Sequence, residues 1–258
     1  MKLPAYITTS WDDGHPLDMR LAEILGAYGL PGTFYLPLAN VAALLTRPQM
    51  RELGRHFEVG AHTLHHCDLL RVPHEVARRE ILDCKSALEQ IVGRPCTAFC
   101  FPLGHFRRHH LAYVREGGYE LARTVELMSL DRPHLHDGVA LMPTTLQAVP
   151  TSFVRLARNS LKRRRFGNLL RYLHCRRPDW VATAEVLLEQ VIESGGVFHL
   201  WGHSWEIDQM GQWPNFRRVC ALLAQLRGRA TFVDNTTLAQ MVLGEGSTTP
   251  VRPLRGVA

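Results

Sequence analysis

The sequence predicts an α/β fold in which parallel strands are wrapped by helices. Short apolar runs rich in β-branched and aromatic residues alternate with longer segments in which apolar residues recur at helical spacing. This alternation is typical of a parallel sheet, and it leaves open whether the sheet closes into a barrel. No linker rich in proline, glycine or serine interrupts the 258 residues. We therefore expect one domain over 1–243 and a disordered tail over 244–258.

Each predicted strand is an apolar run bounded by residues typical of turns. Pro37 closes the second run, and Pro102 and Gly104 follow the fourth. The seventh run begins directly after Gly195 and Gly196. We expect strands at 6–10, 33–36, 57–61, 97–101, 121–125, 139–142, 197–201 and 230–233.

The predicted helices lie between these strands and each has an apolar stripe. In the first, Leu17, Leu21, Ile24 and Leu25 fall on one face, and Gly29 follows its end. The same reasoning predicts helices at 17–28, 48–53, 74–92, 109–116, 182–193, 216–226 and 237–242, and further helices within 151–174.

Cysteine usage and the first residues bear on the compartment. The six cysteines show no paired CxxC spacing, so we expect reduced, mostly buried thiols rather than disulfides or a structural zinc cluster. Residues 1–10 are too short for the apolar core of a signal peptide, and no run approaches the ~18 apolar residues of a membrane helix. We expect a cytoplasmic protein without a membrane span.

The chain is basic, with a formal net charge of +6, and its densest basic run is Lys162-Arg163-Arg164-Arg165. Such a run can mark a nucleic-acid or anionic membrane surface. The sequence has no nucleic-acid motif, and the run lies in a predicted helix, so we interpret it as a solvated face. An acidic or phosphate-bearing substrate is compatible with the charge.

Candidate catalytic residues follow three of the predicted strands. Asp12 and Asp13 come after the first strand, His62 and His66 after the third, and His203 after the seventh. The carboxyl ends of parallel strands meet at one rim, where ligands of such folds bind. We therefore expect these side chains to lie close together.

The two aspartates can divide the work of a metal-dependent hydrolase. Consecutive strand residues point to opposite faces, so Asp12 and Asp13 share a site only if the chain leaves strand geometry, which Gly14 would permit. One carboxylate would then bind the metal while the other acts as a general base.

The histidines complete a set of two imidazoles and one carboxylate. If the segment after Gly60 coils, His62 and His66 project to the same side, with His65 as a competing ligand. Such a set leaves open positions on an ion and suits a hydrolase, although it also suits Fe(II).

Four motifs occur in order along the chain: Thr9-Ser10-Trp11-Asp12-Asp13-Gly14, His62-Thr63-Leu64-His65-His66, Phe101-Pro102-Leu103-Gly104 and Leu200-Trp201-Gly202-His203. In this order the chain resembles the polysaccharide deacetylases of the NodB homology domain, carbohydrate esterase family four. The first two motifs are highly specific and the last two are looser. The resemblance runs over nearly the whole chain.

The resemblance implies a distorted (β/α) barrel and a divalent metal, most often zinc, with Fe²⁺, Co²⁺ or Ni²⁺ as alternatives. It implies Asp13, His62 and His66 as the metal ligands. Asp12 matches the catalytic base and His203 the catalytic acid. A metal-bound water would then attack the acetamide carbonyl of an N-acetylated sugar, and acetate and a free amine would result.

The candidate substrate-binding residues lie in the third motif and around His203. Pro102 and Leu103 are expected beside the reacting carbonyl, where a backbone N–H near Leu103 would stabilise the oxyanion. Trp201 and Trp205 are candidates for stacking on a sugar ring. The expected partner is a carbohydrate or another small amide, and the oligomeric state is not indicated.

The chain also departs from the family pattern. An arginine that tethers the catalytic aspartate usually begins the third motif, but Cys100 stands at that position, so Arg123 or another arginine must substitute or the activity is altered. The aspartate that normally supports the catalytic histidine has no clear match, and Glu206 and Asp208 are candidates for that role. His199 is a rival acid, although the alternation of a buried strand favours a structural role.

Three alternatives remain open from the sequence. The scaffold could hydrolyse another C–N bond, such as that of a cyclic ureide or a formylated amine. It could be an oxygen-using iron enzyme, against which the spare carboxylate of Asp12 argues. It could also be a non-catalytic carbohydrate-binding relative that has lost the tethering arginine.

Overall fold

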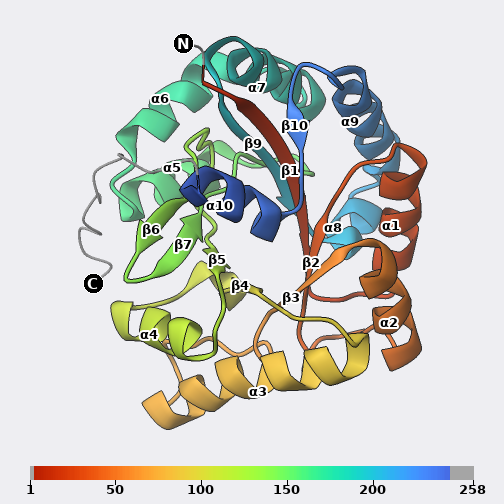
Figure 1. Ribbon diagram of the computed structural model, residues 1–258. Coiled ribbons are helices and arrows are strands. Elements are labelled where there is room, and N and C mark those ends of the chain that lie inside the picture. Colours follow the sequence, from red (N-terminus) through yellow and green to blue (C-terminus); the bar gives the residue numbers. More distant parts are fainter. Residues whose placement is uncertain (1–2, 245–258) are drawn as a thin grey trace.

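The strands form one sheet that curls around a central axis, with helices on its outside (Figure 1). The computed structural model describes residues 3–244. The order in the sheet is β6-β7-β5-β4-β3-β2-β1-β9-β8, β10 also pairs with β1, and all the pairs are parallel except β6 with β7. The strands are β1 (Ala5–Asp12), β2 (Thr33–Leu36), β3 (Glu58–Ala61), β4 (Ala98–Cys100), β5 (Leu121–Arg123), β6 (His134–His136), β7 (Val139–Met142), β8 (Leu146–Gln147), β9 (Gly196–Gly202) and β10 (Thr231–Phe232).

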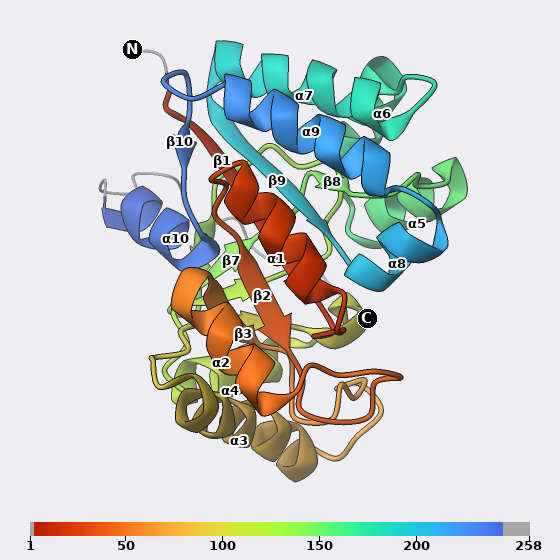
Figure 2. The same cartoon turned by 90° about the vertical axis from the view of Figure 1, so that its right-hand side faces the viewer.

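Most helices pack around the outer surface of the sheet (Figures 1 and 2). The helices are α1 (Asp18–Ala27), α2 (Arg47–His56), α3 (His74–Val92), α4 (Arg108–Glu116), α5 (Phe153–Lys162), α6 (Phe166–Cys175), α7 (Trp180–Ser194), α8 (Ser204–Gln209), α9 (Trp213–Gln225) and α10 (Asn235–Gly244), with a 3-10 turn η1 (Pro102–Gly104). Helix α10 differs, because it contacts β1, β5 and β7. It packs against residues at or near the amino ends of strands, such as Tyr6, Ala98 and Leu121. It closes the barrel at the amino ends of the strands.

The alternation of side chains along β1 separates two cores. Ile7 and Trp11 face outward into the large core between the sheet and the helices. Tyr6 faces inward and packs in a smaller core with Leu238 of α10. Asp12 continues the inward series at the carboxyl end of the strand. The barrel interior is therefore apolar at the α10 end and polar at the opposite rim.

The structure confirms the predicted α/β fold and its barrel form. All eight expected strands are present, while β6, β8 and the short helix α8 were not expected. Within 151–174 the chain forms two antiparallel helices, since Arg164 has a left-handed backbone with φ of 53° between α5 and α6. The predicted tail lies outside the described residues apart from Gly244.

All six cysteines are free thiols in the structure, and five of them are buried. Within 3–244, no helix has the length and apolar character required to cross a membrane. The cytoplasmic location stays a prediction.

Replacing Leu238 with alanine should lower the free energy of unfolding by about 2–5 kcal/mol, because its fully buried side chain fills the closed end of the barrel. Met241 is 38% exposed on the same helix, so Met241→Ala should change that free energy by no more than about 0.5 kcal/mol. Urea unfolding of the two variants measures the difference. Equal losses of unfolding free energy in the two variants would contradict the proposal that Leu238 fills the closed end of the barrel.

Candidate active site

The loop after β1 brings two neighbouring carboxylates into one site. Asp12 is buried at the end of β1, and Asp13 follows with φ of 79°. This left-handed backbone is unfavourable for a residue with a Cβ, but it keeps Asp13 from pointing to the opposite face of the sheet. Gly14 continues with φ of 62°, which glycine adopts readily. The expected departure from strand geometry is present and begins at Asp13.

The loop after β3 carries the histidines, but it is not a helical turn. Thr63 and His66 have positive φ values of 61° and 47°, and no helix forms from 62 to 66. The condition that the segment coils is therefore not met: the loop is irregular, and the Thr63 hydroxyl accepts the backbone N–H of Cys67 at 3.3 Å. The rings of His62 and His66 still lie 4.9 Å apart.

Asp13, His62 and His66 together offer three ligand atoms within 4.8 Å of one another. Asp13 Oδ1 lies 3.1 Å from His66 Nε2 and 3.7 Å from His62 Nε2. This oxygen is buried and makes no hydrogen bond among the described residues. A buried carboxylate oxygen without a donor, faced by two imidazole nitrogens, fits a divalent cation.

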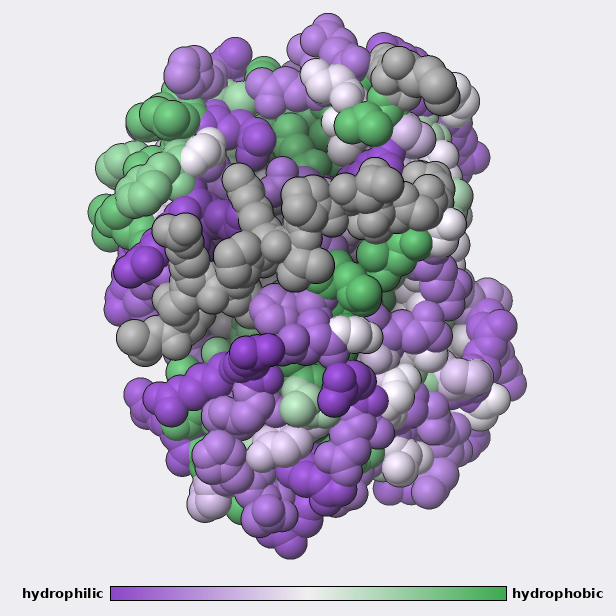
Figure 3. Space-filling view, turned by 60° about the vertical axis from the view of Figure 1, so that its left-hand side comes forward, coloured by the Kyte–Doolittle hydropathy of each residue, from purple (hydrophilic) through white to green (hydrophobic). Residues whose placement is uncertain are grey.

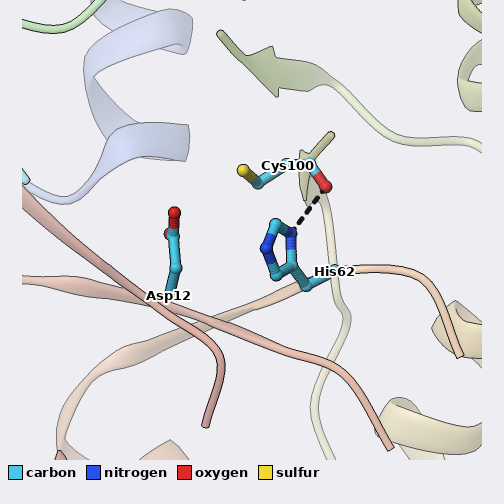
Figure 4. A group of neighbouring side chains, drawn as sticks. All are labelled: Asp12, His62 and Cys100. Carbon is cyan, nitrogen blue, oxygen red and sulfur yellow. Dashed lines mark hydrogen bonds between the residues drawn. The ribbon is translucent and has the colours of Figure 1, made fainter. Parts of the chain in front are cut away.

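A second group of potential ligands, Asp12, His62 and Cys100, meets at the same histidine (Figure 4). His62 Nδ1 lies 2.9 Å from the backbone oxygen of Cys100, which fixes the tautomer and leaves Nε2 free for the site. Burial raises the pKa of the Cys100 thiol well above its usual value, so the thiolate that a metal requires is disfavoured. Asp12 is already bound by an arginine. The chemistry therefore favours the group containing Asp13.

Arg123 supplies the arginine that the third motif lacks. Its side chain is completely buried and donates to Asp12 Oδ2 from β5. The guanidinium also lies 4.9 Å from the ring centre of Trp201. Cys100 and Arg123 are register partners across β4 and β5, so the cation comes from the neighbouring strand. Burial alone would raise the pKa of Asp12, but the charge of Arg123 and the nearby imidazoles lower it below its usual value.

His203 follows β9 and faces both carboxylates. Its Nε2 lies 3.9 Å from Asp12 Oδ2 and 3.8 Å from Asp13 Oδ2. Its Nδ1 lies 2.6 Å from Glu206 Oε2, and Gln147 donates to that same oxygen at 2.5 Å. Burial alone would lower the pKa of His203, but the Glu206 hydrogen bond and the aspartates raise it. Of the two acidic residues considered for orienting His203, Glu206 occupies that position.

The two rival histidines are engaged elsewhere. His65 Nδ1 lies 2.6 Å from Glu80, whose carboxylate also accepts the backbone N–H of His65. His199 is fully buried between the Ser10 hydroxyl, at 2.8 Å, and the backbone oxygen of Pro143, at 3.0 Å. Burial lowers the pKa of His199 to about 3, so it is neutral and holds β1 against β9.

The residues expected at the substrate have different environments. Trp201 is buried with 3% of its surface exposed, which leaves little of the ring for a sugar. Trp205 is half-buried, and its indole N–H donates to Asp13 Oδ2 at 3.0 Å, so it orients that carboxylate. Pro102 is buried, while Leu103 is 59% exposed with φ of 58°. Leu103 and Trp205 therefore have the accessible surface.

Three buried polar residues near the site were not predicted from the sequence: Gln147, Asp18 and Ser204. Gln147 on β8 holds Glu206, as described above. Asp18 is fully buried and accepts the Ser204 hydroxyl at 2.5 Å. Burial raises the pKa of Asp18 well above its usual value, which favours a neutral carboxyl near the two charged ones. An aspartate in the first turn of a helix is common, so nothing in the local pattern around Asp18 indicates a role at the site.

Comparison with known proteins identifies relatives by fold and by the N-terminal motifs. The polysaccharide deacetylase family model matches residues 3–122. A search of curated proteins gives no match. A structure from Mycobacterium smegmatis assigned to the polysaccharide deacetylases has a TM-score of 0.69 at 17% identity, over 98% of this chain and 96% of that one.

Two further structures share the fold. The chitin deacetylase of the fungal pathogen Colletotrichum lindemuthianum has a TM-score of 0.56 at 15% identity, over 90% of this chain and 85% of that one. A family 4 carbohydrate esterase from Bacillus anthracis has a TM-score of 0.55 at 14% identity, over 92% and 83%. Residues 3–122 are therefore similar to the polysaccharide deacetylase family, and the chain has the barrel fold of these solved structures.

Proposed function

We propose that this chain is a metal-dependent hydrolase that removes the acetyl group from an N-acetylated sugar. The observation that carries the proposal is the convergence of Asp13, His62 and His66, with Asp12 and His203 at their side. Two imidazoles and one carboxylate favour zinc, although Fe²⁺, Co²⁺ and Ni²⁺ accept the same ligands. When bound, the metal would polarise the amide carbonyl and acidify a water.

The remaining groups have the positions needed for proton transfer. Asp12 Oδ1 is buried without a hydrogen-bond partner among the described residues, so it can accept a proton from the attacking water. Arg123 holds the opposite oxygen and keeps the carboxylate ionised. His203 Nε2 faces the same space and can give its proton to the nitrogen as the C–N bond breaks. Acetate and a free amine are the products.

Metal content and activity should be lost together in His66→Ala, because this variant removes a ligand facing Asp13 Oδ1. His65→Ala is the matched control, since His65 lies in the same loop but is bound to Glu80. We expect about one metal ion per chain in the wild type and in the control. Elemental analysis gives the metal content, and acetate release from a panel of N-acetylated sugars gives the activity.

The same panel separates the alternatives if it includes formylated amines and cyclic ureides. If only the formylated amines or cyclic ureides were hydrolysed, the substrate would be another compound with a C–N bond and not an N-acetylated sugar. Sugar binding without turnover would indicate a non-catalytic relative. Equal metal content in wild type, His66→Ala and His65→Ala would contradict the site itself.

Arg123→Met should lower the free energy of unfolding by about 3–5 kcal/mol, because it leaves the buried Asp12 carboxylate without its cation. The double variant Arg123→Met/Asp12→Asn removes both charges and should regain most of that loss. Urea unfolding of the four proteins of this cycle measures the coupling. A double variant no more stable than Arg123→Met would contradict the ion pair as the source of the loss.

The pH dependence of hydrolysis should show the effect of Glu206 on the pKa of His203. A raised pKa keeps His203 protonated to higher pH, so activity should persist below that pKa and fall as the pH rises through it. Glu206→Gln removes the carboxylate that raises the pKa, and the fall should move down by about one pH unit. Asp208→Asn removes a charge from the same helix, at a residue bound to Trp213, and should leave the profile in place. A profile unchanged in Glu206→Gln would show that another group sets it.

A further inference from the structure

Helices α5 and α6 form an antiparallel hairpin with many exposed apolar side chains. The ring of Phe153, at the start of α5, stacks with that of Tyr172, near the end of α6. Half of the large hydrophobic residues exposed within 3–244 belong to this hairpin, at 45–73% exposure: Phe153, Val154, Leu161, Phe166, Leu170 and Leu173. Figure 3 shows hydrophobic surface gathered along the left edge of the molecule, on the side where these helices lie.

The exposed side chains follow helical spacing on each helix. On α6, Phe166, Leu170 and Leu173 are separated by four and three residues and share one face. On α5, Leu156 and Ser160 face the protein, while the apolar residues before and after them face away. Each helix is thus amphipathic, but part of its apolar surface points outward. An apolar surface rimmed by polar residues is typical of a docking site.

The hairpin also concentrates positive charge. Residues 151–178 contain nine of the 30 lysines and arginines and no aspartate or glutamate, so the rest of the chain has 21 basic against 24 acidic residues. Arg158 and Lys162 are exposed and make no ion pair within the described part of the chain. The net positive charge of the protein therefore comes from this one hairpin.

We propose that the α5–α6 hairpin docks on an anionic lipid bilayer surface. Outward apolar side chains among cations match the two parts of such a surface, since the acyl region accepts the apolar groups and the headgroups attract the cations. Long lysine and arginine side chains can reach the headgroups while their stems stay in apolar surroundings. The hairpin lies in the interface and does not span the bilayer.

Other occupants match only one of these two features. A nucleic acid would satisfy the cations but leave six apolar side chains in water. A second copy of the hairpin would bury apolar surface but bring like charges such as Arg158 and Lys162 of the two copies together. Residues 245–258 carry two arginines and one glutamate, so their charge does not complement the hairpin either.

The docking surface adjoins the candidate active site. Arg163, at the end of α5, donates to the backbone oxygen of Gly104 at 3.2 Å, in the loop of the third motif. Arg155, in the first turn of α5, is close enough that its charge helps to lower the pKa of Glu206. Docking through the hairpin would therefore bring the bilayer next to the rim of the barrel.

Vesicle sedimentation of the full chain tests the proposal without any measurement of activity. We expect binding to vesicles of equal parts phosphatidylcholine and phosphatidylglycerol, little binding to phosphatidylcholine alone, and release by high salt. Leu161→Ser/Leu170→Ser should weaken binding at least about tenfold by removing apolar groups from the docking face. The matched control, Leu70→Ser/Met241→Ser, changes exposed apolar residues elsewhere and should bind as the wild type does.

A second pair of variants separates the charge of the hairpin from net charge. Arg158→Glu/Lys162→Glu should remove the preference for anionic vesicles, whereas Arg79→Glu/Arg229→Glu makes the same change of charge elsewhere and should keep it. No sedimentation with anionic vesicles at low salt would overturn the proposal. Equal losses of vesicle binding in the test variants and their controls would also overturn it. The protein could instead bind RNA or an acidic protein equally well with and without Leu161→Ser/Leu170→Ser, and fail to bind vesicles. That result would identify the other partner and overturn the bilayer proposal.

Discussion

The buried ion pair between Arg123 and Asp12 is the constraint on which the site depends. It joins β5 to β1 inside the barrel, between residues 111 positions apart, and neither side chain has appreciable exposure. Removing two charges from water is costly, so each partner is tolerated only while the other is present. The pair fixes Asp12 at the end of β1, and the left-handed turn that follows then directs Asp13 toward His62 and His66.

The same constraint separates the roles of two adjacent carboxylates. Like charges this close would raise the pKa of one another in a buried site. Arg123 compensates Asp12, whereas the indole N–H of Trp205 donates to Asp13 Oδ2, and Asp13 Oδ1 lies 3.1 Å from His66 Nε2. That oxygen is the one aimed at the histidines, so in the proposed mechanism Asp13 would bind the cation and Asp12 would act as the base. Asp18 behind them adds no charge while it stays protonated.

The sequence predicted what depends on local pattern and missed what depends on tertiary contact. Strand and helix alternation gave the fold, because burial of each element shows in its own spacing. The two-residue strand β8 has no pattern of its own, and Gln147 on it supports Glu206 only through the folded chain. The spacing of His62 and His66 is compatible with a helical turn, but the loop is irregular there, with left-handed backbone at Thr63 and His66 and the Thr63 hydroxyl accepting the backbone N–H of Cys67. Arg123 was one named candidate among several arginines, since only the strand register places it beside Asp12.

The register also explains how an arginine on β5 can bind the Asp12 carboxylate when the third motif has Cys100 in place of an arginine. Neighbouring strands lie about 4.8 Å apart, and an arginine side chain is longer than that spacing, so its guanidinium can reach one carboxylate from either of two adjacent strands. Cys100 and Arg123 are directly paired, and both strands end at the same rim. The guanidinium of Arg123 lies between the rings of Tyr35 and Trp201, 5.4 Å and 4.9 Å from their centres. What the buried carboxylate requires is therefore a cation at a point in space, and a motif that fixes the arginine in sequence is only one way to place it there.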